Sequence, residues 1–443
     1  MSETANPESV GMSSQRLERL QHWLDQQVSC GRLAGVSAMV GRRGKIAFYG
    51  NAGLAERETG RSFQRDTLVR IFSMTKPVTT VAAMMLYEQG CFQLDDSVSQ
   101  YLSEFADTPV WIGNTASIDA VEKQQNPITI RQLMNHTSGL TYEFLHANPV
   151  DNYYRDQGIN FQSTEYTLEE MVQKLAAAPL LCQPGSQWNY SVATDVLGRL
   201  IEVWSGASLQ AFFKERIFEP LQMLDTGFHV EPHKHQRFSA MYGPAGGRGL
   251  ADVGQSSNGR SGVRQSATNE CSTAKAAPGL DLLEPAADNR FLHAASLYSG
   301  GGGLTASIDD YARFCQMLLN GGSLDGNRLL SPITVDYMCT NQLRDNRDLA
   351  AMGQPVWSET SYEGIGFGLG FAIVLDPVKA HIITSAGEAH WGGAASTFFW
   401  IDKKQELFTI LFTQLMPSST YPLRRELRAR VYQAIVEATL EVE

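Results

Sequence analysis

The sequence lacks several features that would place it in a large protein class at once. No apolar run approaches the ~18 residues that a membrane-spanning helix needs, so we expect no membrane span. Lysine and arginine are in deficit, at 36 against 47 acidic residues, and a net charge of −11 argues against nucleic acid as a partner. The first residues show no basic start followed by an apolar stretch, as a secretory signal would. We therefore expect a cytoplasmic protein.

Paired cysteines and the common hydrolase and nucleotide motifs are also missing. The six cysteines are scattered without a C-x-x-C pair, and we expect them to be reduced, mostly core residues. There is no G-x-S-x-G, no G-x-x-x-x-G-K-[ST] and no H-E-x-x-H, which argues against a nucleophile elbow, a phosphate-binding loop and a zinc-protease helix. His229, His233 and His235 lie close together, but a solvated loop explains them better than a metal site does. We expect no metal and no cofactor.

The composition and both chain ends indicate a folded α+β protein. With 443 residues, 43% of them hydrophobic, the chain can bury a core in each of two or three structural units. Residues 17–28 have helical spacing of leucines, and residues 36–48 alternate as a hairpin. Near the other end, residues 396–412 form a second hairpin. Pro422 then opens a final helix whose apolar stripe runs through Ile435 to Ala438. Both ends are therefore predicted to build one antiparallel sheet with helices packed on it.

The middle of the chain has a different character. Residues 67–240 are mostly helical in pattern, which predicts an inserted helical domain within a discontinuous sheet domain. We expect the sheet domain to comprise residues 1–66 and 291–443, and the helical domain residues 67–290. Between positions 243 and 279 glycine and serine dominate and large apolar residues are scarce. Such a segment is predicted to be a flexible surface loop, with a lid over a site as the alternative.

The strongest chemical signal is the sequence SMTKP at residues 73–77. The apolar run after Pro77 predicts a buried helix, and proline is tolerated only in the first turn of a helix. Ser73 and Lys76, three residues apart, would therefore share one face at the helix start. A buried lysine loses hydration, its pKa falls, and it can accept the serine proton. A second S-x-x-K at residues 272–275 has no apolar helix to bury its lysine, and we do not expect it to be functional.

Two further segments accompany this motif. Residues 184–191 (PGSQWNYS) form a turn with alternating aromatics that ends at Tyr190, and a helical run begins at Asp195. Residues 390–394 (HWGGA) lead into a predicted strand, where small residues let a ligand approach the backbone closely. Taken singly, Tyr190 could be a core aromatic and the second segment a plain glycine turn.

In this order, the three segments resemble the serine β-lactamase and penicillin-binding-protein superfamily, and within it the family VIII carboxylesterases, relatives of class C β-lactamases. LMNHTSGLTY at residues 133–142 and YSGGGGLTAS at residues 298–307 add to the resemblance. The implied fold is the β-lactamase/transpeptidase-like α+β fold. The implied roles are Ser73 as acylated nucleophile, with Lys76 and Tyr190 sharing general base and acid work. The backbone N–H groups of Ser73 and Ala394 would form the oxyanion hole.

The resemblance also suggests which residues meet the substrate, listed here: Trp391, Gly392, Gly393, Tyr142 and Asp195. Trp391 stands where the lactamases carry the lysine of K-T-G, and with Tyr142 it would wall an apolar pocket, to which Trp188 or Phe367 could add. Asp195 would orient the site or cap its helix.

Two departures from the lactamase pattern bear on the substrate. Y-x-N becomes Tyr190-Ser191-Val192, which removes an amide, and Trp391 replaces a cation. Each lost contact is worth ~1–3 kcal/mol, and both losses favour a neutral ester over an anionic antibiotic. We therefore expect a serine carboxylesterase acting on short-chain acyl esters. The alternatives are a β-lactamase or D-aminopeptidase-like amidase, and a binding protein that kept the fold without catalysis.

Overall fold

The computed structural model describes residues 4–113, 115, 117–247, 249, 279–353 and 362–438, and the structural statements below concern these residues. The second S-x-x-K motif at 272–275 and the glycine- and serine-rich segment, except near its two ends, lie outside them.

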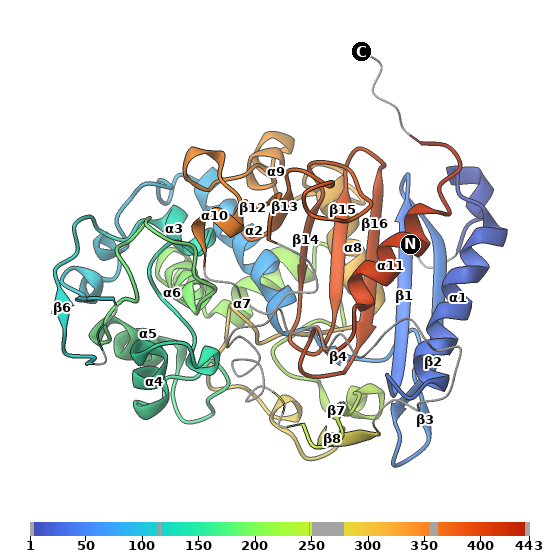
Figure 1. Ribbon diagram of the computed structural model, residues 1–443, viewed down its shortest axis with the longest axis horizontal. Coiled ribbons are helices and arrows are strands. Elements are labelled where there is room, and N and C mark those ends of the chain that lie inside the picture. The colour runs from blue at the N-terminus through green and yellow to red at the C-terminus, as the bar shows by residue number, and fades with distance from the viewer. Residues whose placement is uncertain are drawn as a thin grey trace.

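An eight-stranded antiparallel sheet forms the centre of the described structure (Figure 1). In spatial order its strands are β12 (Ile365–Phe367), β13 (Ala372–Val374), β14 (Ala389–Gly392), β15 (Phe398–Asp402), β16 (Leu407–Thr413), β1 (Gly35–Arg42), β2 (Lys45–Glu56) and β3 (Arg61–Ser62). The two predicted terminal hairpins meet where β1 pairs with β16, with Val36 opposite Thr413. The prediction that both ends of the chain share one antiparallel sheet is confirmed.

Alternating side chains give this sheet two apolar faces. In β15, Phe398 and Trp400 belong to one buried cluster, whereas Phe399 and Ile401 belong to another. The same alternation holds in β16 and β1, because successive side chains of a strand point to opposite faces. Both faces therefore need a covering layer.

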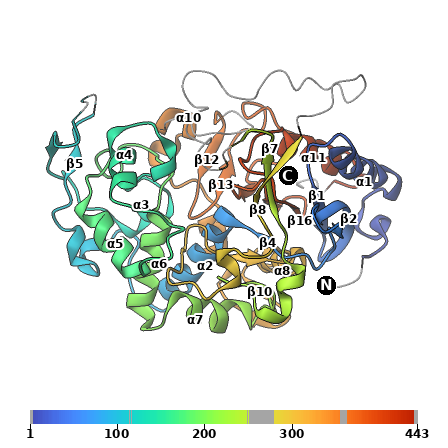
Figure 2. The same ribbon diagram turned by 90° about the horizontal axis from the view of Figure 1, so that it is seen from below.

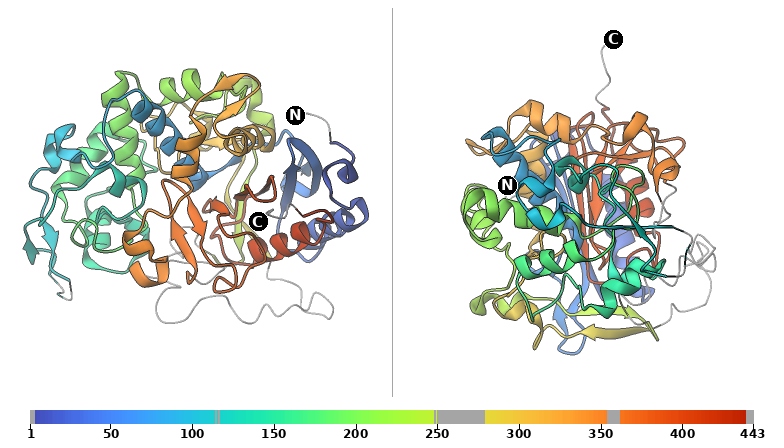
Figure 3. Two further views of the ribbon diagram at one scale, coloured as in Figure 1. Left: turned by 90° about the horizontal axis from the view of Figure 1, so that it is seen from above. Right: turned by 90° about the vertical axis from the view of Figure 1, so that its left-hand side faces the viewer.

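Helices supply a layer on each face. The described α-helices are α1 (Ser14–Ser29), α2 (Thr75–Glu88), α3 (Ile130–Met134), α4 (Pro149–Asp156), α5 (Leu168–Ala177), α6 (Ala193–Ser205), α7 (Leu209–Phe213), α8 (Ile308–Leu319), α9 (Pro332–Met338), α10 (Leu349–Met352) and α11 (Leu423–Tyr432). Helices α1 and α11 cover one face, and the Trp23 indole of α1 donates to Glu426 of α11 at 2.6 Å. Helix α8 covers the other, where the Tyr311 ring lies 5.1 Å from that of Phe399. The views in Figure 3 show helices on both sides of the sheet.

Helices α3 to α7 gather beside the β12 end of the sheet, on the left in Figure 1. Among the regular elements of residues 67–240, helices outnumber strands. Four short strand pairs complete the described structure: β4 (Val69–Arg70) with β9 (Thr305–Ala306), β5 (Val110–Trp111) with β6 (Val121–Glu122), β7 (Met241–Pro244) with β8 (Leu280–Glu284), and β10 (Ser323–Leu324) with β11 (Asn327–Arg328). The β7–β8 pair joins the two ends of the glycine- and serine-rich segment and is seen from below in Figure 2.

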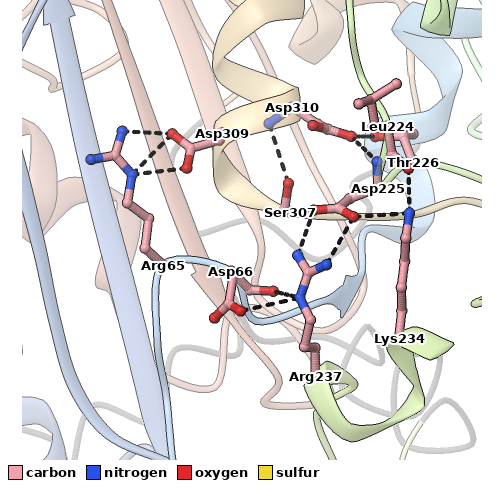
Figure 4. Close-up of polar contacts among 10 residues, drawn as sticks. All are labelled: Arg65, Asp66, Leu224, Asp225, Thr226, Lys234, Arg237, Ser307, Asp309 and Asp310. Atoms are coloured by element: carbon pink, nitrogen blue, oxygen red, sulfur yellow. Dashed lines mark hydrogen bonds and ion pairs between the residues drawn. The ribbon is translucent and has the colours of Figure 1, made fainter. Parts of the chain in front are cut away.

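A network of charged residues ties the segment around Asp225 to the start of β4 (Figure 4). The Asp225 carboxylate accepts from Arg237 at 2.9 Å and forms an ion pair with Lys234 at 3.0 Å. Arg237 also donates to the Asp66 carbonyl at 2.8 Å. Asp310 at the start of α8 accepts from the Asp225 backbone N–H at 2.7 Å. The network thus holds α8 and the approach to β4 together.

Two expectations about the chain prove wrong. The final helix begins after Pro422 as predicted but ends at Tyr432, so Ile435 and Ala438 do not continue its stripe. The chain leaves the helix because Ile435 pairs with Met12, and the N–H groups of residues 436 and 437 donate to the Gly11 carbonyl. Cys30 is disulfide-bonded, whereas we expected every cysteine to be reduced.

In the described residues no helix combines the length and the apolar character that crossing a bilayer requires.

Candidate active site

Ser73 lies in a tight turn between strand β4 and helix α2. The turn is the short 3-10 helix Phe72–Met74, and α2 follows directly, so Pro77 lies in its first turn as predicted. Phe72 has a φ of 43°, a left-handed conformation that bulky residues rarely adopt without support from their surroundings. Part of that support comes from Tyr311, whose hydroxyl donates to the Met74 carbonyl at 2.9 Å.

Lys76 is buried and donates three hydrogen bonds. Its Nζ lies 3.3 Å from Ser73 Oγ, 2.9 Å from the Tyr142 hydroxyl and 2.7 Å from the Gly301 carbonyl oxygen. Burial lowers the pKa of Lys76 to about 7, because the interior disfavours the ammonium, and the negative charge of Asp195 opposes this fall. A lysine with this pKa is partly neutral near pH 7 and can take up a proton.

Tyr190 makes the shorter contact with the serine. Its hydroxyl donates to Ser73 Oγ at 2.5 Å, and its ring centroid lies 4.7 Å from Lys76 Nζ. The segment before it is fixed by the Asn189 N–H, which donates to the His136 carbonyl at 2.8 Å. Burial raises the pKa of the Tyr190 phenol, against the opposing effect of its contacts with Ser73 and Trp391. The phenol is therefore protonated at neutral pH.

The turn between β14 and β15 approaches Ser73 from the sheet. A Cβ at Gly393 would lie 2.4 Å from the Ile71 carbonyl oxygen, so this turn packs backbone to backbone against the segment that leads to Ser73. Its shape is fixed by the Gly393 N–H, which donates to Thr397 at 2.9 Å, and by the Ala394 carbonyl, which accepts from Ser418 at 2.8 Å. Gly392 faces Arg424 of α11, because a Cβ there would lie 2.6 Å from the guanidinium Nη2.

Aromatic side chains surround Tyr190. Trp391 lies 5.4 Å from it between ring centroids, and Phe367 lies 5.2 Å from Trp391. Trp188 stacks near Tyr190 at 6.3 Å. His136 lies edge-on to Tyr190 at 5.1 Å, and burial lowers the pKa of this imidazole well below its usual value. The residues Trp188, Phe367 and Trp391 thus belong to one aromatic cluster that contacts Tyr190, with Trp188 and Phe367 buried.

Two residues predicted to meet the substrate are buried close to the catalytic candidates. Tyr142 is buried, and its hydroxyl accepts from Lys76. Asp195 has 0% of its surface exposed, and its Oδ1 accepts from the Ser299 hydroxyl at 2.6 Å and the Gly301 N–H at 3.0 Å. Asp195 therefore lies behind Lys76, at the start of helix α6.

The loop around Gly301 contacts Lys76, a contact that the sequence analysis did not predict. It contains the glycine run at residues 300–303, and the β4–β9 pair places it beside the approach to Ser73. The Gly301 carbonyl lies 225 positions from its Lys76 partner in sequence. The glycine run itself was the available signal, since glycine permits close backbone approach.

The three histidines at 229, 233 and 235 do not form a metal site in the part of the chain that the structure describes. Groups of three or more potential ligands able to hold a metal ion are absent from these residues. His235 instead contacts the Val230 carbonyl at 2.9 Å.

Comparisons with known proteins identify the family of this chain. A model of the Beta-lactamase family matches residues 20–433. Esterase EstB of Burkholderia gladioli is 32% identical over 94% of each chain. Two solved structures cover nearly the whole chain. EstCE1, a hydrolase with promiscuous acyltransferase activity, has a TM-score of 0.73 and 26% identity over 94% of this chain and 99% of its own. Simvastatin synthase (LovD) from Aspergillus terreus has a TM-score of 0.74 and 25% identity over 96% and 98%.

These matches confirm both the resemblance and the β-lactamase/transpeptidase-like α+β fold. The chain belongs to the β-lactamase family.

Proposed function

We propose that this protein is a serine carboxylesterase that hydrolyses short-chain acyl esters through an acyl-enzyme on Ser73. The observation that carries the proposal is the position of Ser73 Oγ, which lies 2.5 Å from the Tyr190 hydroxyl and 3.3 Å from Lys76 Nζ. Esterase EstB, a relative at 32% identity, supports the general class of a serine hydrolase acting on esters.

Lys76 and Tyr190 divide the proton transfers between them. Neutral Lys76 accepts the proton of Ser73, because its pKa of about 7 leaves part of it neutral near pH 7, while the raised pKa of Tyr190 keeps that phenol protonated. Ser73 Oγ forms a bond to the ester carbonyl carbon, and Tyr190 donates a proton to the alcohol oxygen as the C–O bond breaks. Lys76 then returns a proton to Tyr190. Because the two groups interact, their titration belongs to the pair.

Backbone N–H groups stabilise the negative charge on the carbonyl oxygen. The N–H of Ser73 and that of Ala394 form the oxyanion hole, with the tight packing of Gly393 on Ile71 fixing their separation. Lys76 then takes a proton from a water molecule, whose oxygen bonds to the acyl carbon. The bond from that carbon to Ser73 Oγ breaks, the lysine–tyrosine pair returns a proton to Oγ, and the acid leaves.

The surroundings of Ser73 favour a neutral acyl group. Trp391 lies beside Tyr190 with the buried Phe367 ring against it, and Val192 replaces the amide of the Y-x-N pattern that lactamases carry. We propose that Trp391, Gly392 and Gly393 line the substrate side of the site.

Acyl transfer to an alcohol is a second candidate activity. The structural neighbours EstCE1 and simvastatin synthase have names that include acyl transfer or synthesis. An acyl-enzyme is resolved by an alcohol in the same way as by water, with an ester as product. Adding a primary alcohol to the hydrolysis assay and measuring the new ester by chromatography tests this candidate.

The test of the main proposal is hydrolysis of p-nitrophenyl butyrate by wild type and Ser73→Ala. We expect the variant to lose all measurable turnover, whereas the exposed Ser103→Ala control keeps the wild-type rate. Turnover that survives in Ser73→Ala overturns the proposal. A kcat/KM for nitrocefin above that for the ester supports the β-lactamase or amidase alternative. A folded protein inert toward esters, nitrocefin and fluorophosphonates supports the non-catalytic alternative.

A further inference from the structure

We propose that Asp195 is a positioning residue whose negative charge, held across the Gly301 backbone from Lys76, sets the charge state of that lysine. This inference rests on the proposed function, in which Lys76 accepts the Ser73 proton. It assigns Asp195 a place behind the lysine, away from the substrate.

A short chain of contacts links the two residues. Asp195 Oδ1 accepts from the Gly301 N–H at 3.0 Å, and the carbonyl oxygen of the same residue accepts from Lys76 Nζ at 2.7 Å. Ser299 fixes the carboxylate from a second side, with its hydroxyl 2.6 Å from Oδ1. A Cβ at Gly301 would lie 2.5 Å from Asp195 Oδ2 and 3.1 Å from the Tyr142 hydroxyl. No side chain fits there, so the glycine backbone itself connects carboxylate and lysine.

The second carboxylate oxygen of Asp195 makes no hydrogen bond among the described residues, and the side chain is fully buried. A buried carboxylate oxygen without a donor is costly unless a positive charge lies nearby. Burial raises the pKa of Asp195 above its usual value, and the positive charge of Lys76 opposes this rise. The Ser299 and Gly301 donors act in the same direction as Lys76.

Several other titratable groups face this pair from the elements around it. Tyr142 and Tyr190 contact Lys76 directly, His136 interacts with Lys76 electrostatically, Glu143 faces Asp195, and Arg424 acts on Tyr190.

At neutral pH most of these neighbours carry no charge. Burial raises the pKa of Tyr142 and of Tyr190, and burial raises the pKa of Glu143 to about 8. Burial, followed by the effect of Lys76, lowers the pKa of His136 well below its usual value. Among the described residues that face Lys76, Asp195 therefore supplies the negative charge. Burial lowers the pKa of Lys76, whereas the charge of Asp195 raises it.

The balance between these two effects keeps the pKa of Lys76 near 7. Burial alone would lower it further and weaken Lys76 as a base, because a weaker base has less driving force for proton transfer. The negative charge of Asp195 raises the pKa back toward the working pH. Asp195 thus affects the reaction without touching the substrate.

The test compares Asp195→Asn with wild type over pH 5 to 9. Asparagine can still accept from Ser299 and Gly301 through Oδ1, so mainly the charge is lost. The acid limb of kcat/KM, which reports neutral Lys76, should move to lower pH by about one unit, with a lower plateau. The same shift is expected in the rate at which a fluorophosphonate labels Ser73, which needs no ester turnover.

Ser299→Ala is the matched control, because it removes one hydrogen bond and keeps the carboxylate. It should lower the rate and leave the midpoint of the acid limb where it is in wild type. If the activity of Asp195→Asn falls but the midpoint of the acid limb does not move, Asp195 has only a structural role. That result overturns the inference. If Asp195→Asn does not fold, Asp195→Ser removes the same charge and must shift the limb in the same direction.

Failure of this inference differs from failure of the proposed function. Wild type in which Ser73 is not labelled contradicts the esterase proposal itself. Normal labelling of wild type, with an unshifted limb in Asp195→Asn, contradicts only the function given to Asp195.

Discussion

At the scale of single residues, burial moves the pKa values of the two groups that contact Ser73 in opposite directions. Burial disfavours the charged form of each, which lowers the pKa of Lys76 to about 7 and raises that of Tyr190. Lys76 becomes partly neutral and can accept a proton, whereas Tyr190 stays protonated and has a proton to donate. The S-x-x-K spacing and the apolar run after Pro77 predict the first effect from sequence. The orientation of Tyr190 depends on the fold, which brings positions 73 and 190 together.

Removing the Tyr190 hydroxyl tests this division of labour. Tyr190→Phe keeps the ring contacts with Trp391 and Trp188 and loses the 2.5 Å contact with Ser73. We expect kcat for p-nitrophenyl butyrate to fall ~10²–10⁴-fold, the usual contribution of a general acid.

Tyr101→Phe is the matched control for this prediction, because Tyr101 also loses a hydroxyl hydrogen bond, to Asp96 at 2.8 Å, away from the site. Its rate should equal that of wild type. Equal rates in Tyr190→Phe and wild type would show that the phenol takes no part in the chemistry.

At the scale of elements, the backbones of the turn after β14 and of the loop of residues 300–303 shape the site as much as the side chains do. The sequence pattern of neither segment predicts which residues it contacts. Alternation predicts that a strand exists, but it does not predict that Gly393 lies against Ile71. The end of α11 shows the same limit. An apolar stripe through Ile435 looks helical in sequence, yet pairing with Met12 outweighs it.

Gly393→Ala tests the turn. The added methyl would lie 2.3 Å from Thr397 Oγ1 and 2.4 Å from the Ile71 carbonyl oxygen, so the turn or the Ser73 segment must shift. We expect kcat to fall ~10²-fold, comparable with the loss of one oxyanion donor, with little change in KM. Gly113→Ala is the control, since a Cβ at Gly113 meets no atom within 4 Å. Gly387→Ala is less suitable, because Gly387 has a positive φ. A Gly393→Ala enzyme with full kcat would remove this turn from the mechanism.

The network of charged residues in Figure 4 is expected to stabilise the folded protein. Burial by itself raises the pKa of Asp225. The contacts with Arg237 and Lys234 outweigh burial and hold the pKa of Asp225 below its usual range. Such a group stabilises the native state above its unfolded pKa, and the contribution is lost as pH falls through the lower folded value. Asp225→Asn should therefore lower the free energy of unfolding by about 1–2 kcal/mol at pH 7, since the pair is partly exposed.

Urea denaturation at pH 7 and at pH 3 measures this effect, and the difference between variant and wild type should shrink at the lower pH. Asp309→Asn, which breaks the more exposed pair with Arg65, is the control and should cost less. A loss in Asp225→Asn that is as large at pH 3 as at pH 7 contradicts the electrostatic explanation.

At the scale of the whole molecule, the site lies where the sheet and the helical region meet. The sheet contributes Trp391 and the Gly393 turn from β14, whereas the helical region contributes Tyr190 and Asp195 at the start of α6. Alternation at the two chain ends predicts the centre of the sheet. The short strands β12 and β13, three residues each, give too little alternation to be read. The division into two domains, at 66, 67, 290 and 291, and the cytoplasmic location stay predictions.

The most direct test of the central claim is to locate the adduct of a fluorophosphonate by mass spectrometry and to time its formation. The account predicts one adduct per chain, on Ser73, absent in Ser73→Ala and formed at least ~10²-fold more slowly in Tyr190→Phe. Labelling of another residue in wild type, or equal labelling rates in wild type and Tyr190→Phe, would contradict it.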